Sequence, residues 1–318
     1  MDVVRGLAAL LIVVHHSVVL VDDYGGPIPP GWVDDANDAL APFRIPTLMF
    51  LSGMLLGPAL RKGARRYAVG KWRNLLWPYL VWVVLFGALS WPVWSVPGFL
   101  LGGSYLWFLL YLAAYYALAW VLRPVPVVAV VVVALVAAFL APDGDRYLER
   151  GPYLFALFMT GHLAAHHGRA WSWLVRSPWA LVGAVAVVVA HVPTPLGSAY
   201  GPRSCLLTLA GIVLLTRAAR RTAHLRALRP VRFVGRNSLV YYVVHYPATA
   251  AVVTLAAGAA TAPDVPALVV LNTVVALVLA TALALLRHRP LVSWLFEAPA
   301  LPGRRRPAAV VTGTRAPA

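Results

Sequence analysis

Charged side chains are scarce in this sequence. Asp, Glu, Lys and Arg make up only 12% of the 318 residues, whereas soluble globular domains carry about 25%. Hydrophobic residues make up 61%, and the mean hydropathy is +0.76. These values exclude an ordinary soluble domain and indicate a chain that crosses a membrane several times.

Cysteine and several common catalytic motifs are also missing. Cys205 is the only cysteine, which excludes a disulfide framework and a zinc site built from several cysteines. The sequence has no HExxH or HxxEH spacing, so we expect no metal site. A glycine-rich phosphate loop and a GxSxG nucleophile motif are absent as well. The chemistry of this chain must therefore rest on other residues.

The apolar residues form ten stretches, several of them short for a span of about 20 residues. The stretches are roughly 6–21, 44–60, 75–91, 104–122, 126–141, 153–166, 178–192, 203–216, 238–259 and 267–286. The sequence therefore predicts an all-α fold, a polytopic transmembrane helical bundle of about ten spans over residues 1–300. The Arg- and Pro-rich residues 301–318 are typical of a disordered basic tail.

Acidic residues are few, 11 against 27 basic ones, and the net charge is +16. In a soluble protein this charge would suggest nucleic acid, but here the basic residues gather in alternate loops, at 61–73 and 217–232, while 22–38 is acidic. The positive-inside rule then predicts that both termini and the tail are cytoplasmic. We expect a multi-pass protein of the inner (cytoplasmic) membrane, with the lipid bilayer and not nucleic acid as its surroundings. Arg44 and Arg203 are exceptions at the outer ends of spans.

Two ionisable residues lie on one face of the first apolar stretch. Arg5 and His16 are eleven residues apart, which returns the second to within about 20° of the first on a helix and about 16 Å along it. This places Arg5 near a membrane surface and His16 close to mid-bilayer, where ionisable groups are costly and usually functional. His15 points about 80° away from Arg5. The spacing therefore selects His16, although a buried hydrogen-bonded histidine and a snorkelling arginine remain the simpler readings.

A second polar stripe lies in the ninth stretch. Ser238, Tyr242 and His245 follow one another at helical spacing, so they share a face that should point toward protein or a cavity. Arg44 is open to two interpretations, an interface anchor or a contact to a substrate.

Six segments occur in a characteristic order along the chain. They are DVVRGLAALLIVVHH, FRIPTLMFLSGMLLG, KWRNLLWPYLVW, YLWFLLYL, GPYLFALFMTGHL and GRNSLVYYVVHYP. Their succession resembles the membrane-bound acyltransferase family 3, integral-membrane O-acyltransferases of surface glycans and secondary metabolites. The most specific element is Arg, ten residues, His in the first stretch. The third segment departs from the family pattern, because many members have two arginines three apart where this chain has Lys71, Arg73 and Asn74.

The resemblance implies an O-acyltransferase, with O-acetyl transfer favoured, that moves an acyl group from cytoplasmic acyl-CoA to a hydroxyl of a sugar, glycan or secondary metabolite. Acyl-CoA, with acetyl-CoA favoured, is then the donor substrate, and no cofactor is bound permanently. A neutral imidazole suits the general base that an attacking alcohol needs, so the catalytic residues would be His16 and Arg5. Arg5, Lys71 and Arg73 would bind the donor, and Arg44, Ser238, Tyr242 and His245 the acceptor.

Two alternatives use the same polar residues. A polytopic transporter of a small molecule or acyl group would also bury ionisable side chains, although its inverted repeats are not visible here. A module of this family could also bind the acyl group or the acceptor on behalf of another enzyme. Release of CoA from a thioester by the purified protein separates these possibilities.

Overall fold

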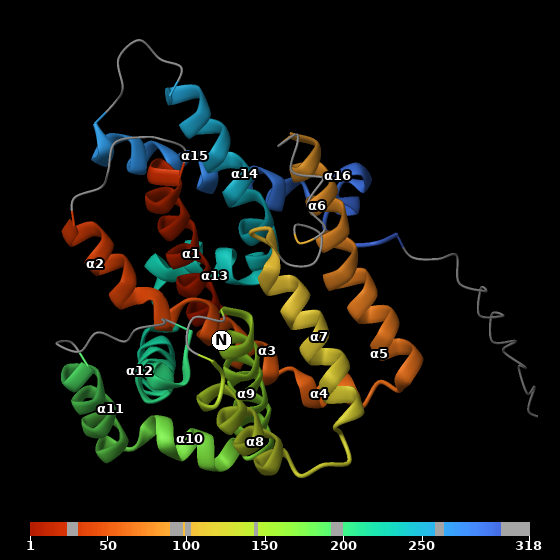
Figure 1. Ribbon diagram of the computed structural model, residues 1–318, viewed down its shortest axis with the longest axis vertical. Helices are drawn as coiled ribbons and strands as arrows, with labels where there is room; N and C mark the ends of the chain where they lie inside the picture. Colours follow the sequence, from red (N-terminus) through yellow and green to blue (C-terminus); the bar gives the residue numbers. More distant parts are fainter. Residues whose placement is uncertain are drawn as a thin grey trace, which may run out of the picture.

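The structure, a computed structural model, describes residues 1–23, 31–89, 98, 103–142, 146–191, 200–257 and 264–299. All the regular elements in these ranges are helical (Figure 1). The predicted tail at 301–318 lies outside the described residues. The longest helices are α1 (Asp2–Asp23), α9 (Arg146–His166), α12 (Cys205–Thr222), α14 (Ser238–Ala257) and α15 (Val265–Leu286).

The other helices are shorter and connect or flank the long ones. Those of ten to fifteen residues are α2 (Gly31–Leu40), α6 (Trp77–Leu89), α7 (Trp107–Val121), α8 (Val127–Phe139) and α11 (Pro178–His191). Shorter still are α3 (Ile45–Gly53), α4 (Leu56–Leu60), α5 (Ala64–Lys71), α10 (Gly168–Arg176), α13 (Arg229–Arg236) and α16 (Pro290–Trp294). Single turns form η1 (Ala41–Phe43), η5 (Pro202–Ser204) and η6 (Arg226–Leu228), and η2 (Trp72–Leu76) is a π-helical segment.

Each of the ten apolar stretches coincides with a helix or a pair of helices. By length and composition, four helices in the described ranges could each cross a membrane: α1, α14, α15 and the segment Pro202–Thr222 that contains α12. The bent pair of α10 and α11, with 72° between them, would make a fifth. The all-α membrane fold is therefore confirmed, while the count of about ten spans and the cytoplasmic termini stay predictions.

The first helix lies at the centre of the bundle. α1 packs against α13, α14, α15 and α3, and in Figure 1 it stands between α2 and α14. The same view places α5, α6 and α7 on the right and α8 to α11 toward the bottom. In the window that could cross a membrane, 56% of α1 is buried inside the protein. This position lets one helix carry residues of two different sites at different depths.

The crossing of α3 and α9 depends on small residues. A Cβ atom on Gly53 would overlap the carbonyl oxygen of Phe158, and one on Gly161 would overlap that of Phe50. The two backbones therefore approach more closely than any side chain would allow, as in other membrane helix pairs. The crossing fixes α3, whose two ends contribute to the sites described below.

Candidate functional site

His16 contacts a second histidine deep in the bundle. The Nε2 atom of His245, on α14, lies 3.1 Å from Nδ1 of His16, on α1. His245 has no exposed surface, while His16 is partly exposed to a cavity. The sequence placed His245 among the acceptor contacts. The structure places it behind His16 and outside the cavity lining.

Backbone carbonyl groups determine which ring nitrogens carry the protons. Nδ1 of His245 lies 3.1 Å from the carbonyl oxygen of Tyr241, and Nδ1 of His16 lies 3.0 Å from that of Ile12. A carbonyl oxygen can only accept, so both Nδ1 atoms are donors in neutral rings. The Nδ1–H of His16 is then shared between the carbonyl oxygen of Ile12 and the Nε2 lone pair of His245. Within the described part of the chain Nε2 of His16 has no hydrogen-bond partner, so its lone pair is available to a ligand, which is the form a general base requires.

His15 belongs to a different network. Its Nδ1 atom donates to Oδ1 of Asn37, at 3.0 Å, and the same oxygen accepts a hydrogen bond from Arg44. Arg44 also donates to the carbonyl oxygen of Asn37. His15 is thus hydrogen-bonded to α2 and takes no part in the hydrogen bond between His16 and His245, although its ring packs edge-on against His16 with 4.7 Å between the centroids.

A cavity of about 230 Å³ borders His16, and we call it the histidine cavity. Two cations line it, Arg44 and Arg150, together with several aromatic rings. Its polar and aromatic lining consists of His15, His16, Arg44, Ser104, Tyr105, Trp107, Tyr111, Arg150, Tyr200 and Tyr242. None of these lining residues is a carboxylate. The cavity can hold a small polar molecule next to the lone pair of His16.

A second cavity, of about 290 Å³, borders Arg5, and we call it the basic cavity. Four cations line it: Arg5, Lys62, Arg66 and Lys71. Its other polar lining residues are Ser52, Tyr67, Asn74, Tyr116, Ser238 and Tyr242. Carboxylates are again absent from the lining residues. This concentration of positive charge suits an anionic ligand.

The two cavities lie at different depths along the same helices. On α1, Arg5 lines the basic cavity and His16 the histidine cavity, and on α3 Ser52 and Ile45 divide in the same way. Tyr242 of α14 lines both. Its hydroxyl donates to the carbonyl oxygen of Tyr105, at 2.6 Å, which holds the ring in place. Tyr242 therefore stands at the boundary between the two sites.

Lys71 is a partly buried cation of the basic cavity. Its ammonium nitrogen lies 3.1 Å from the ring centroid of Tyr116, a close cation–π contact. Burial lowers the pKa of Lys71 to about 8, and the nearby positive charge of Lys62 adds to the shift. The side chain lies in the basic loop that precedes the third predicted span. It is still mostly charged at neutral pH and loses its charge in the mildly alkaline range.

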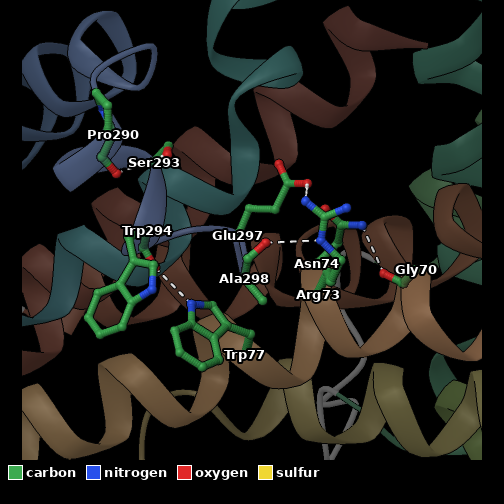
Figure 2. A network of polar contacts seen from close by, with 9 residues as sticks. All are labelled: Gly70, Arg73, Asn74, Trp77, Pro290, Ser293, Trp294, Glu297 and Ala298. Carbon is green, nitrogen blue, oxygen red and sulfur yellow. Dashed lines mark hydrogen bonds and ion pairs between the residues drawn. The ribbon is translucent and has the colours of Figure 1, made fainter. Parts of the chain in front are cut away.

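Arg73, expected beside Lys71 in the donor site, lies elsewhere. Figure 2 shows its guanidinium group turned toward the C-terminal segment, where it forms an ion pair with Glu297 at 2.8 Å and donates to the carbonyl oxygen of Ala298 at 2.9 Å. In the same view Trp77 donates to the carbonyl oxygen of Trp294. Arg73 is absent from the lining of the basic cavity. Its contacts join η2 to the segment after α16.

The polar stripe of α14 is divided between the sites. Ser238 lines the basic cavity with Arg5, Tyr242 borders both cavities, and His245 contacts His16. The three residues share one helix face, as the spacing predicts, but they lie at three depths. They do not line one common cavity, and their part in acceptor binding stays a prediction.

Comparison with known proteins identifies the family. The acyltransferase domain of acyltransferase family 3 matches residues 1–286. The chain belongs to acyltransferase family 3. No curated protein and no solved structure gives a significant match. The protein is therefore a membrane-associated acyltransferase, and the family favours catalysis over the transporter alternative.

Several residues of the acyltransferase cavities were not among the predicted site residues. Lys62 and Arg66 line the basic cavity. In the sequence they indicated only the membrane topology, as part of the basic segment 61–73. Arg150 lies before the sixth apolar stretch and reaches the histidine cavity. Arg150, like Arg44, is a charged residue close to the end of a predicted span, and this position is the signal that could have indicated a place in the site. Among the described residues, no group of three or more His, Cys, Asp or Glu side chains has metal-binding geometry.

Proposed function

We propose that this acyltransferase moves an acyl group, preferably acetyl, from cytoplasmic acyl-CoA to a hydroxyl of a sugar, glycan or secondary metabolite. The observation that carries the proposal is the hydrogen-bond arrangement of His16, which leaves Nε2 with a free lone pair beside a cavity. An alcohol becomes a competent nucleophile only as its proton is removed, and a positioned imidazole performs this step in many enzymes.

The donor is assigned to the basic cavity. Coenzyme A carries a pyrophosphate and a ribose phosphate, and Arg5, Lys62, Arg66 and Lys71 offer complementary charge. The guanidinium of Arg5 can bind two phosphate oxygens at once, which an ammonium group cannot do. The acceptor is assigned to the histidine cavity, and the thioester meets it near Tyr242, which borders both cavities.

With His16 as the base, the bonds and protons of the reaction balance without any other catalytic group. Nε2 of His16 takes the hydroxyl proton as the acceptor oxygen attacks the thioester carbonyl carbon. The new C–O bond forms, the C–S bond breaks, and the departing thiolate receives the proton from the imidazolium. While His16 is protonated, its Nδ1–H remains bonded to the Ile12 carbonyl and to His245, which holds the ring in one orientation.

The membrane orientation follows from the same assignment. A cytoplasmic donor requires the basic loops at 61–73 and 217–232 to be cytoplasmic, in line with the positive-inside rule. We place the protein in the inner (cytoplasmic) membrane as a multi-pass enzyme with both termini on the cytoplasmic side. The histidine cavity then lies toward the opposite surface.

The test is CoA release from acetyl-CoA by the purified protein in lipid nanodiscs, with a panel of methyl glycosides as acceptors. His16→Ala should lower the rate by about 10²-fold or more, the usual contribution of a general base. His15→Ala is the matched control, because this imidazole lies beside His16 but hydrogen-bonds to Asn37 and to neither histidine of the pair. We expect a smaller loss from it. An active His16→Ala enzyme at wild-type abundance would remove His16 from the mechanism.

A further inference from the structure

The histidine cavity carries more positive charge than the transfer of an acyl group to a neutral alcohol requires. Arg44, at the start of α3, and Arg150, on α9, both line it next to His16. None of the lining residues is a carboxylate. The question is what the buried guanidinium group of Arg44 binds.

Arg44 is the more informative of the two. Only 2% of its surface is exposed, and the structure records no ion pair for it within the described part of the chain. Its hydrogen bonds go to the neutral Asn37, and its Nε atom is buried without a hydrogen-bond partner among the described residues. The carboxylate of Asp38 on α2 interacts electrostatically with Arg44 but does not line the cavity. A buried cation without a counter-charge is unfavourable unless a ligand supplies one.

Arg150 and the aromatic rings complete the cavity. The guanidinium of Arg150 lies 4.5 Å from the ring centroid of Trp107 and 5.1 Å from that of Tyr200, so the two rings fix its position. Tyr105 and Tyr111 add further aromatic surface. Aromatic walls with a few fixed polar groups are typical of sites for small organic ligands. Here the fixed groups are two arginines and the base.

We propose that the acceptor is a sugar derivative that carries an acidic group, a carboxylate or a phosphate, bound by Arg44 and Arg150 while one hydroxyl faces Nε2 of His16. This inference rests on the proposed function and narrows its acceptor. The planar guanidinium groups match the geometry of both acidic groups. A neutral sugar would leave Arg44 without a counter-charge.

The experiment compares methyl glucuronide and methyl glucoside 6-phosphate with methyl glucoside, which has the same ring and no charge. Saturation-transfer NMR on the wild-type protein in nanodiscs measures binding, and CoA release from acetyl-CoA measures transfer. We expect at least one acidic glycoside to bind and react about tenfold better or more, the usual effect of charged hydrogen bonds. The two acidic probes decide between carboxylate and phosphate.

Variants then connect the preference to the cavity. Arg150→Gln should reduce the preference for the acidic glycoside to about twofold or less, while Arg150→Lys should keep part of it because the charge remains. Arg203→Gln is the matched control, since Arg203 is an exposed arginine of η5 that lines neither cavity. It should keep the full preference.

The outcomes separate this inference from the proposed function. If the wild-type protein binds all three glycosides equally, or if Arg150→Gln lowers transfer to acidic and neutral acceptors by the same factor, the inference is overturned. The second result would mean that the arginine stabilises the reacting oxyanion instead. If an acidic glycoside binds preferentially but no CoA is released, the proposed function fails and the anion site stands.

Discussion

The contact between His16 and His245 joins residues 229 positions apart. Because the Nε2 lone pair of His245 accepts the Nδ1–H of His16 and His245 does not line the cavity, we predict that His245 positions His16 and does not touch the substrate. We expect His245→Leu to lower kcat by about tenfold or more, because the His16 ring loses one of the two groups that fix its tautomer and orientation. KM for the acyl-CoA donor should stay unchanged. Kinetics with each substrate varied in turn measure both constants.

A conservative variant separates positioning from simple packing. His245→Gln offers an amide oxygen that can accept the same hydrogen, so it should recover part of kcat. The ¹⁵N shifts of labelled His16 should report the Nδ1–H tautomer in the wild type, and the Nδ1 shift should change in His245→Leu because this hydrogen keeps the Ile12 carbonyl but loses its second acceptor. Equal activity of both variants with an unchanged His16 spectrum would contradict the positioning role.

Lys71 predicts a pH dependence for donor binding. Since burial lowers its pKa to about 8, the ammonium charge is present below this pH and is lost as the pH rises through it. The KM for acyl-CoA should therefore increase between about pH 7.5 and 9. Lys71→Arg should remove this increase, because a guanidinium stays charged throughout the range. A KM that is independent of pH in the wild type would mean that Lys71 does not contact the donor.

Predictions of which residues share a face agreed with the structure where all the residues lie on one helix. The spacing of Arg5 and His16 on α1 indicates a shared face, and the structure places both residues at cavities. The partner of His16 could not be deduced, because it lies on α14 and depends on how two helices pack. The face of Ser238, Tyr242 and His245 was predictable, but each step of three or four residues moves the side chain about 4.5–6 Å in depth. That distance is enough to divide the stripe between two cavities.

At the scale of helices, the close crossing of α3 and α9 makes Gly53 sensitive to substitution. In Gly53→Ala the added methyl group would overlap the backbone of Phe158, which cannot move aside as a flexible side chain could. We expect a loss of stability of about 1–3 kcal/mol. A drop in activity should accompany it, because α3 carries Leu48 and Ser52 of the basic cavity. The measurement is the melting temperature by fluorescence-detected size exclusion.

Gly183→Ala is the control for this substitution. Gly183 lies inside α11, and a Cβ atom there would meet nothing within 4 Å. The same added methyl group should leave the melting temperature unchanged or raise it slightly, because alanine favours the helix. If the two variants melted at the same temperature, the close approach of α3 and α9 would not contribute to stability.

The positions of helices were predictable from hydropathy, but their breaks were not. The stretch 44–60 appeared continuous, yet the structure divides it into α3 and α4. Between α10 and α11 the chain bends by 72° at Ser177, whose ψ of 129° is extended. Pro178 follows Ser177, and a proline disfavours helical backbone at the residue before it. The position of this proline could therefore have indicated the bend. Hydropathy sums apolar character and carries no information on direction, so it misses such bends.

For the whole molecule, the charge distribution and the two cavities lead to the same orientation. The basic loop at 61–73 supplies Lys62, Arg66 and Lys71 to the basic cavity, whereas the acidic segment at 22–38 covers most of α2, whose Asn37 contacts His15 and Arg44 near the other cavity. The proposed acyl-CoA donor is made in the cytoplasm and would have to reach the basic cavity from there. The loop proposed to bind the donor is then the loop that the positive-inside rule retains in the cytoplasm.

Cysteine labelling tests this orientation in intact cells. Single cysteines at the exposed positions Asp35, Arg65 and Arg226, each in a Cys205→Ser background, are treated with a membrane-impermeant thiol reagent. Only Asp35→Cys should react, and all three should react once the membrane is permeabilised, which confirms that each site is accessible. This expectation rests on the distribution of charge. Residues 61–73 and residues 217–232 each contain six cations, whereas residues 22–38 contain five acidic residues. Labelling of Arg65→Cys or Arg226→Cys in intact cells would place the basic cavity on the outside, where acyl-CoA could not reach it, and the donor assignment would fail.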